Sequence, residues 1–271
     1  MADDVHSPTN PLVKRFVRLR ARRPREREGL LVVEGARELT RAVQAGWSLP
    51  LLASCPERFS PDAEAALALL QGAAGEHRRF GPAAFDRASL RQHPDGLLGL
   101  VRWREVDPES LPWPDTACYL VIAGLEKPGN VGALLRSAAA AGVDAVFVTG
   151  AGTDLGNPNV VRASMGSLFA LPVLALADEH ARALLGSHGV RVITTSPDAS
   201  ETFWDADLTG AVAVVIGPEH EGLDAAWRGA ADLEVRVPMA GSVDSLNAAT
   251  AGGLVLYEVL RQRRARRRMP H

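Results

Sequence analysis

The sequence predicts two α/β domains, the second built on a mostly parallel sheet with helices on both faces. From residue 117 onward, continuous apolar runs of strand length alternate with helical stretches, a pattern typical of parallel strands that are buried on both sides. A proline-rich break separates this region from a shorter first part, in which strand and helix patterns are also mixed. We therefore expect one domain at residues 1–105, a linker at 106–116 and a second domain at 117–271.

In the first domain the elements follow from local periodicity. A basic amphipathic segment comes first, and helices are expected at residues 34–45 and 61–70. Short apolar runs predict strands at residues 30–33, 49–53 and 97–101. This mixture of short strands and helices predicts a small α/β domain.

In the second domain the apolar runs are more regular. They predict strands at residues 117–123, 145–149, 171–176, 190–194, 212–216 and 233–237. Helices are expected at residues 131–141, 159–169, 179–185, 224–231 and 245–263. Because open parallel sheets bind ligands beyond the carboxyl ends of their strands, the binding site is expected in the loops at Gly124, Gly150, Thr195, Gly217 and Pro238.

Composition narrows the class of protein. Of the 271 residues, 46% are hydrophobic and 23% are charged, which excludes collagen-like and wholly disordered chains. Cys55 and Cys118 stand far apart and form no C-x-x-C or Cys/His cluster, so neither a disulfide framework nor a metal site is expected. The first residues are polar and charges interrupt the long apolar runs. We expect a soluble cytoplasmic protein with no signal peptide and no membrane span.

Positive charge gathers at the two ends of the chain, although the net charge is only −2. The residues expected to contact nucleic-acid phosphates lie beside apolar residues near the start, and they are Lys14, Arg15, Arg18, Arg20, Arg22 and Arg23. Arginine suits this role because its planar guanidinium matches the geometry of a phosphate. The second basic run, at residues 261–268, is equally consistent with a solvated tail.

The loop at residues 150–156 resembles a dinucleotide-binding turn, because three glycines follow a predicted strand. Its spacing fails in detail. The third glycine is one residue late, and Pro158 stands where the helix beneath a pyrophosphate should already be under way. A structural loop is favoured, and a nicotinamide-dependent reductase that uses this loop is the competing enzyme hypothesis.

Three other loops combine glycines with polar residues at strand ends. In residues 130–138, Asn130 suits a helix N-cap and Arg136 is the lone charge in an apolar helix. A buried or cleft-facing guanidinium needs an anionic partner, and a structural salt bridge and a ligand contact are equally open. Residues 215–223 place acids in a glycine turn, and residues 237–247 lead from a strand into a helix.

The last predicted helix is rich in small residues. Gly252 and Gly253 lie within it, and glycines in a helix interior are costly unless a neighbour needs the space. We therefore expect another backbone to pass very close to this helix.

Together, these loops resemble the three signature motifs of the SpoU family of RNA ribose 2'-O-methyltransferases, which use S-adenosylmethionine (SAM). The matching segments are residues 130–138, 215–223 and 237–247, and their order and spacing fit as well. Residues 10–14, the arginine-rich stretch and residues 29–37 resemble the RNA substrate-binding domain that many members carry first. The short tRNA-modifying members lack that domain and are a poorer match.

The resemblance implies a deep C-terminal trefoil knot, with a cleft formed by the loops after three strands. The cofactor-binding residues would be Thr195, Ser196, Ile216, Gly217, Val237, Pro238, Met239, Leu246 and Asn247. The catalytic residues would be Arg136, Asn130, Glu219 and Ser245. Since a guanidinium is a poor base, Arg136 is expected to grip the adjacent phosphate and stabilise the developing alkoxide, while the other three orient Arg136 and the hydroxyl.

The resemblance also implies a partner and a substrate. Members are homodimers with the active site near the subunit interface, and the small-residue C-terminal helix is compatible with this arrangement. The expected substrate is RNA, most of all 23S ribosomal RNA. Methylation of that RNA could serve ribosome-directed antibiotic resistance, which is one expected role of the protein. Two alternatives stay open: a tRNA ribose 2'-O-methyltransferase, and a non-catalytic RNA-binding protein of the same fold.

Overall fold

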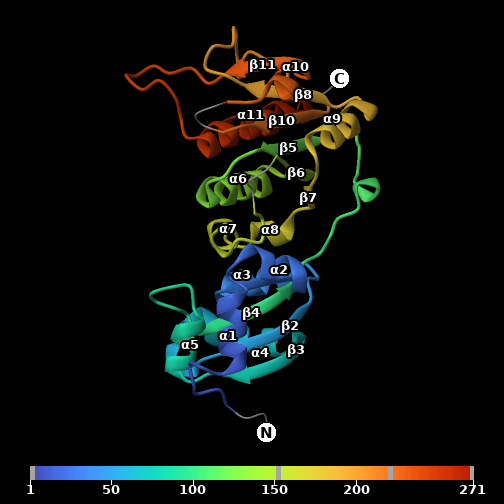
Figure 1. Cartoon of the computed structure of the whole chain (residues 1–271). Coiled ribbons are helices and arrows are strands. Elements are labelled where there is room, and N and C mark those ends of the chain that lie inside the picture. Colours follow the sequence, from blue (N-terminus) through green and yellow to red (C-terminus); the bar gives the residue numbers. More distant parts are fainter. Residues whose placement is uncertain (1–3, 151–153, 219–221, 269–271) are drawn as a thin grey trace. The chain divides into compact units, whose positions relative to one another are not determined.

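The computed structural model describes residues 4–150, 154–218 and 222–268 and divides them between two compact units. The first unit contains the residues up to Glu105 together with Asp154–Ala170. The second contains residues 106–150 and the described residues from Leu171 onward. Each unit is an α/β fold with its own sheet (Figure 1).

The first unit has a sheet in the order β1-β4-β2-β3. Its strands are β1 (Leu30–Glu34), β2 (Leu49–Ser54), β3 (Ala74–Arg79) and β4 (Leu97–Arg102). Strand β4 runs antiparallel to β1 and β2, whereas β3 runs parallel to β2. The expected strands are present, and β3 is an addition. Its polar sequence lies at the sheet edge and is largely exposed, so it offers no apolar run to detect.

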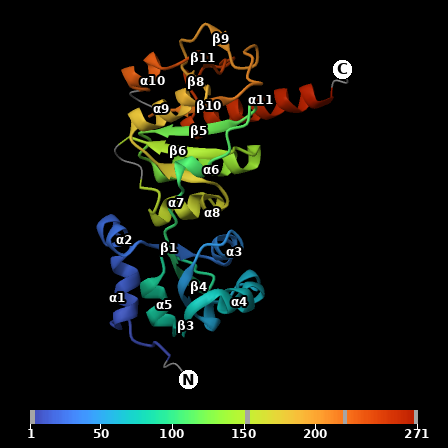
Figure 2. The ribbon, with the colours of Figure 1, turned by 90° about the vertical axis from the view of Figure 1, so that its right-hand side faces the viewer.

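Helices cover both faces of this sheet. They are α1 (Pro11–Arg18), α2 (Arg22–Glu28), α3 (Ala36–Gln44), α4 (Pro61–Ala73) and α5 (Pro82–Ala88). Figure 2 shows α1 and α5 on one side of the sheet, and α3 and α4 on the other. On the first side Phe16 of α1 meets Phe80 edge to face, with 6.0 Å between ring centroids, and both rings are fully buried.

Residues 154–170 pack within the first unit, although the sequence places them in the second domain. The expected helix at 159–169 is two short helices, α7 (Pro158–Ala163) and α8 (Ser167–Ala170). The break lies at Met165 and Gly166, whose φ angles of 52° and 81° are left-handed and therefore incompatible with a continuous helix. The indole of Trp47 holds this segment by donating to the Phe169 carbonyl at 3.2 Å.

Among the described residues, the second unit has a sheet in the order β7-β6-β5-β10-β8-β11-β9, and every pair in it is parallel. Its strands are β5 (Cys118–Ala123), β6 (Ala145–Thr149), β7 (Val173–Ala175), β8 (Arg191–Thr195), β9 (Glu201–Thr202), β10 (Val212–Ile216) and β11 (Leu233–Arg236). The expected parallel α/β architecture is confirmed. Only the two-residue β9 was not predicted.

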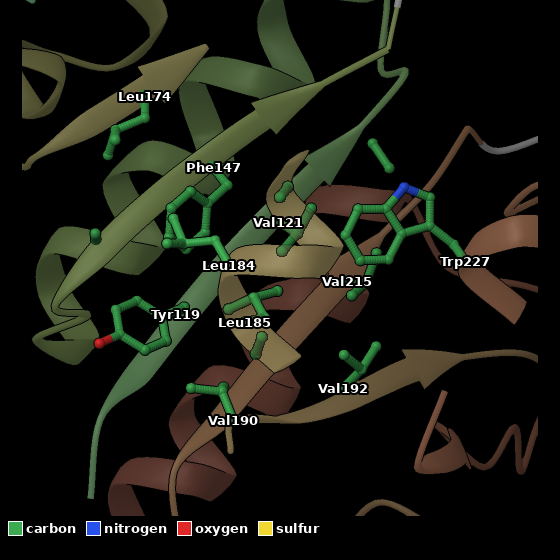
Figure 3. Close-up of a cluster of buried hydrophobic side chains, with 14 of the residues drawn as sticks. Tyr119, Val121, Phe147, Leu174, Leu184, Leu185, Val190, Val192, Val215 and Trp227 are labelled. Carbon is green, nitrogen blue, oxygen red and sulfur yellow. The ribbon is translucent and has the colours of Figure 1, made fainter. Parts of the chain in front are cut away.

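The helices of the second unit are α6 (Pro128–Ala141), α9 (Asp178–Ser187), α10 (Ala225–Gly229) and α11 (Ala248–Arg268). Figure 1 shows α6 and α11 on one side of the sheet and α9 on the other. The face toward α9 is a continuous apolar cluster that includes Val121, Phe147 and Trp227 (Figure 3). Residues 106–116, expected to be an interdomain linker, add Leu111 and Trp113 to this cluster, where both side chains pack against apolar neighbours.

Two further findings concern the chain as described. None of its helices is long and apolar enough to cross a membrane.

Cys55 and Cys118 are both buried free thiols, and burial raises the pKa of Cys55 to about 11 and that of Cys118 to about 12. Both sulfurs are therefore neutral and unreactive at ordinary pH.

Candidate functional site

A cavity of about 180 Å³ opens at the carboxyl ends of β8, β10 and β11. Each strand supplies its terminal residues to the wall: Thr195 from β8, Ile216 from β10, and Val237 just after β11. The expected residues that line it are Thr195, Ser196, Ile216, Gly217, Val237, Met239, Ser245 and Leu246. Segments more than forty positions apart thus meet at one end of the sheet, because parallel strands present their carboxyl ends on the same edge.

The turn after β10 depends on Gly217. A Cβ placed there would lie 2.8 Å from Cδ2 of Leu223 and 3.1 Å from its backbone nitrogen. Any larger residue would push the Leu223 segment out of the cavity wall. Leu223 is itself buried and lines the cavity, so the glycine shapes the floor of the site.

The segment after β5 is joined to the cavity rim by a hydrogen bond. The Nδ2 of Asn247 donates to Oδ1 of Asn130 at 2.9 Å, and the Asn247 Oδ1 accepts from the backbone N of Ala249 at 3.0 Å. Asn247 thus caps the start of α11 and contacts α6 at the same time. The expected N-cap role of Asn130 is wrong, because α6 already begins at Pro128 and Asn130 lies in its first turn.

Helix α11 packs closely on α6 and β10, as its glycines predicted, but the close neighbours are side chains. A Cβ on Gly252 would lie 2.6 Å from Cδ2 of Leu134 and 3.0 Å from Cγ1 of Ile216. A Cβ on Gly253 would lie 3.2 Å from the Ser137 hydroxyl. Since Ile216 also lines the cavity, this helix contact supports the cavity wall from behind.

Some expected site residues do not line this cavity. Pro238 lies between two lining residues without lining it itself, and Glu219 falls outside the described residues. Arg136 is exposed on α6 and makes no hydrogen bond or ion pair with any described residue. Six residues separate it from Asn130, which turns it by about 120° around the helix from the face that meets α11. It is therefore available to a molecule that approaches from outside.

Sequence analysis missed several residues that line the cavity: Pro197, Pro218, Gly222, Leu223, Asp244, Ala248 and Ala251. Most of them are direct neighbours of the recognised loop residues, so continuity of the loops was the available signal. Ala248 and Ala251 instead come from the first turn of α11. Only the packing of that helix against β10 brings them to the cavity.

Some basic residues of the first unit bind other parts of the protein, whereas others are exposed and have no hydrogen-bond or ion-pair partner among the described residues. Arg20 donates to the carbonyls of Arg87, Ala88 and Ser89 at 2.8–3.0 Å, at the end of α5. Its guanidinium is thus committed to the fold. By contrast, Lys14 and Arg23 are exposed and have no partner among the residues that the structure describes.

Three further arginines of this set are paired with acids on the same surface. Arg15 and Arg18 both bind Glu28, at 2.9 and 2.5 Å, and Arg22 binds Glu26 at 2.7 Å. Burial raises the pKa of Glu28, but the hydrogen bonds from the two arginines outweigh it and leave that pKa below its ordinary value.

Within the described ranges, no group of three or more His, Cys, Asp or Glu side chains could hold a metal ion.

The structure explains one glycine of the loop at residues 150–156, which resembles a dinucleotide-binding turn in sequence. Gly150 has a φ of 80°, and a Cβ there would lie 3.0 Å from the backbone of Gly124. Glycine is therefore required where the ends of β5 and β6 approach each other; residues 151–153 lie outside the described part.

Comparison with family models matches both parts of the chain. Residues 117–257 match the SpoU rRNA Methylase family, and residues 10–99 match the MRM3-like substrate binding domain. The first match covers more than half of the chain and includes all three strand-end loops of the cavity.

Two curated relatives are enzymes of ribosomal RNA. The 23S rRNA (uridine(2479)-2'-O)-methyltransferase of Streptomyces viridochromogenes is 32% identical over 250 residues, which cover 89% of this chain and 86% of that protein. The 23S rRNA (guanosine-2'-O-)-methyltransferase RlmB of Xanthomonas campestris is 35% identical over 196 residues, which cover 72% of this chain and 75% of that protein.

A solved structure shares the whole fold. The AdoMet-bound rRNA methyltransferase from Sinorhizobium meliloti superposes with a TM-score of 0.86 at 28% identity, covering 96% of this chain and 97% of that one. Similarity over both units therefore extends beyond the sheet that forms the cavity.

Proposed function

The chain belongs to the SpoU rRNA methylase family, and we propose from this premise that it transfers a methyl group from SAM to a ribose 2'-hydroxyl of 23S ribosomal RNA. The observation that supports this best is the cavity at the ends of β8, β10 and β11, with the Asn130–Asn247 hydrogen bond joining α6 to its rim. The curated relatives act on 23S rRNA, and the match of the first unit to a substrate-binding domain favours ribosomal RNA over tRNA.

The residues around the cavity fit SAM. Apolar Ile216, Leu223 and Met239 can cover the flat adenine, while Gly217 lets the backbone approach it closely. Thr195 and Ser245 add hydroxyl groups that can hydrogen-bond the polar parts of the molecule. When bound, the sulfonium supplies an electrophilic methyl group.

Positioning is the main task of the protein in this reaction. Holding two reactants near 3 Å can supply on the order of 7–11 kcal/mol of the barrier. Exposed Arg136 would bind the phosphate next to the reacting ribose and stabilise the alkoxide as the 2'-oxygen loses its proton. Asn130, fixed by Asn247, would orient the hydroxyl; Glu219 is proposed for the same task.

A second copy of the chain is part of this proposal. Leu254 and Tyr257 on α11 are large apolar residues that are 40% and 50% exposed. Beside them a depression of about 580 Å³ is lined by Tyr257, Leu260 and Ala265 together with two arginines. An exposed apolar face on the long C-terminal helix is suited to homodimerisation.

The cytoplasm, where ribosomal RNA is modified, is the proposed location.

The test uses the full chain, tritium-labelled SAM and 23S rRNA transcribed in vitro, with total tRNA as the second substrate. We expect label in 23S rRNA and, after alkaline hydrolysis, one phosphodiester bond resistant to cleavage at the methylated ribose. Transfer to tRNA alone would establish the tRNA alternative. No transfer to any RNA while RNA is still bound would identify a non-catalytic RNA-binding protein.

A further inference from the structure

A second cavity, of about 330 Å³, lies at the carboxyl ends of β5 and β6. Gly124 after β5 and Gly150 after β6 form one wall, and Trp227 forms another. Pro218, Gly222 and Leu223 line this cavity and the first one alike. The two cavities are thus neighbours along one edge of the sheet, separated by the segment that follows β10.

This second cavity lies where the order of the strands reverses. From β5 the chain proceeds to β6 and β7 on one side, and later places β10 and β8 on the other. In open parallel sheets the crevice at such a reversal is a preferred place for ligands. The cavity assigned to SAM lies farther along the sheet, toward β8 and β11. The cavity at the reversal of strand order can therefore bind a different molecule.

Two carboxylates flank the Trp227 wall, and each uses one oxygen to hold it. The backbone nitrogen of Trp227 donates to Oδ1 of Asp224 at 2.8 Å, and its indole Nε1 donates to Oδ1 of Asp178 at 2.6 Å. Figure 3 shows Trp227 at one end of the apolar cluster. The Oδ2 of each carboxylate has no partner among the described residues, and both aspartates line the cavity. The site therefore offers two hydrogen-bond acceptors.

A buried hydroxyl at the same strand end also lacks a partner. Thr149 is 1% exposed, and its Oγ1 makes no hydrogen bond within the described ranges. It pairs in register with Ala123, so both side chains project from the same face of the sheet, and Ala123 lines the cavity. Buried hydroxyls are rarely left unpaired because doing so is costly. Thr149 itself is not among the residues that line the cavity, so the hydroxyl marks a polar position next to the cavity and not a contact within it.

We propose that this cavity receives the base of the nucleotide that is methylated and that the base is guanine. The inference rests on the proposed function. Arg228 lines the cavity together with the two aspartates, so the site combines two carboxylates with one guanidinium, and a guanine offers donors to the former and its O6 acceptor to the latter. Guanine alone presents two adjacent donors, N1–H and the exocyclic amino group, on its Watson–Crick edge, and these match two acceptor oxygens. The shared wall places the ribose of that nucleotide beside the methyl donor.

Conservative variants of the two aspartates test this assignment. Asp178→Asn and Asp224→Asn keep an oxygen to accept the Trp227 hydrogen bond and replace the other oxygen with a donor amide. We expect kcat/KM for 23S rRNA to fall at least about tenfold in each, with KM for SAM changed less than about twofold. The matched control is Asp232→Asn. Asp232 accepts from the backbone N of Val192 at 2.8 Å at the opposite end of the sheet, and its variant should retain full activity.

The chemical identity of the product decides the matter independently. Labelled 23S rRNA is digested to nucleosides, and 2'-O-methylguanosine is the expected product. Any other 2'-O-methyl nucleoside would overturn the guanine assignment and leave the methyltransferase function standing, whereas unlabelled RNA would overturn both.

A substrate with inosine at the methylated position removes only the exocyclic amino group. This change should lower kcat/KM about tenfold in the wild type and much less in Asp224→Asn or Asp178→Asn. Equal losses in wild type and variants would contradict the proposal. So would recovery of the variants at high MgCl2, because the carboxylates would then serve a cation.

Discussion

At the scale of single residues, the proposed reaction depends on an arginine whose guanidinium binds no other described residue. Arg136 stands on α6 with no partner in the described part of the chain, whereas Arg20 is engaged by three backbone carbonyls. Arg20 stands in an arginine-rich stretch, whereas Arg136 is the lone charge of an apolar helix. Only the packing distinguishes a guanidinium held for the fold from one left for a substrate.

Replacing Arg136 should remove transfer without removing the donor. We expect Arg136→Ala to lower kcat by about 100- to 1000-fold, because the alkoxide loses its positive partner. Arg136→Lys should recover little, since an ammonium cannot match the two-point geometry of a guanidinium on phosphate. The Kd for SAM, measured by calorimetry, should stay within about twofold. Retention of most activity by Arg136→Ala would refute the role.

The exposed cations of the first unit should set RNA affinity. In Lys14→Ala/Arg23→Ala we expect KM for RNA to rise and the slope of log K against log salt to fall by about 2, with an unchanged melting temperature. Arg20→Ala is the contrasting variant and should lower the melting temperature, because three carbonyls lose their donor. An unchanged salt slope in the double variant would count against this surface.

Glu28 should make the first unit sensitive to acid. Its pKa lies below the ordinary 4.5 in the folded state, because the hydrogen bonds from Arg15 and Arg18 outweigh its burial. The stability it adds is present above about pH 4.5 and is lost as the pH falls through the folded pKa. We expect Glu28→Gln to cost at most about 1 kcal/mol at pH 7, since the arginines are partly exposed. In urea unfolding the difference in stability between wild type and Glu28→Gln should shrink as the pH falls below 4.5; a difference that stays constant with pH would contradict this role of Glu28.

At the scale of elements, the cavity rests on the contact between α11 and the elements behind it. Gly252→Ala should destabilise the protein on the order of 1 kcal/mol, because overpacking against Leu134 and Ile216 exceeds the gain in helix propensity. It should also weaken SAM binding, since Ile216 lines the cavity.

Gly253→Ala is the matched control for this helix contact. Its Cβ would meet only the Ser137 hydroxyl at 3.2 Å, so urea unfolding should show equal or greater stability than in the wild type. Identical behaviour of the two variants would show that α11 does not depend on this close approach.

Elements with a strong apolar signal could be predicted closely, and those without it could not. Strand β10 has the expected limits of 212–216 because all five residues are buried. Strand β3 was missed, since its polar residues lie at an exposed edge. The helix expected at 159–169 is broken because Met165 and Gly166 adopt left-handed backbone angles. Arg41 donates to the Met165 carbonyl at this break, at 2.7 Å, a contact that local periodicity cannot reveal.

The same distinction holds for the site. Thr195, Gly217 and Pro238 could be placed at one edge of the sheet because they stand at the ends of predicted parallel strands, and Thr195 and Gly217 line the cavity. Met239 followed only from the family resemblance.

The second cavity could be predicted only in part: the loops at Gly124 and Gly150 were expected at a binding site, but Asp178 and Asp224 meet through the indole and backbone of one buried Trp227. Asp224 and Trp227 have the spacing of a helix N-cap and the residue three positions on, but no sequence spacing relates either of them to Asp178.

At the scale of the whole molecule, the chain order and the compact units do not coincide. Residues 154–170 lie between two strands of the second sheet in sequence but pack in the first unit. Arg25, in the arginine-rich stretch near the start of the chain, is 4% exposed and paired with Asp154 of this segment. A buried charge without a partner is costly, so this pair fixes the segment within the first unit.

The central claim is that three strand ends of the second unit form a binding site for SAM. Isothermal titration of the full chain with SAM and with NADPH, repeated on Gly217→Val, tests it most directly. We expect one molecule of SAM per chain, no heat from NADPH, and loss of SAM binding in a Gly217→Val protein whose circular dichroism is unchanged, because the side chain would displace Leu223. Binding of NADPH, or undiminished SAM binding by that folded variant, would contradict the claim.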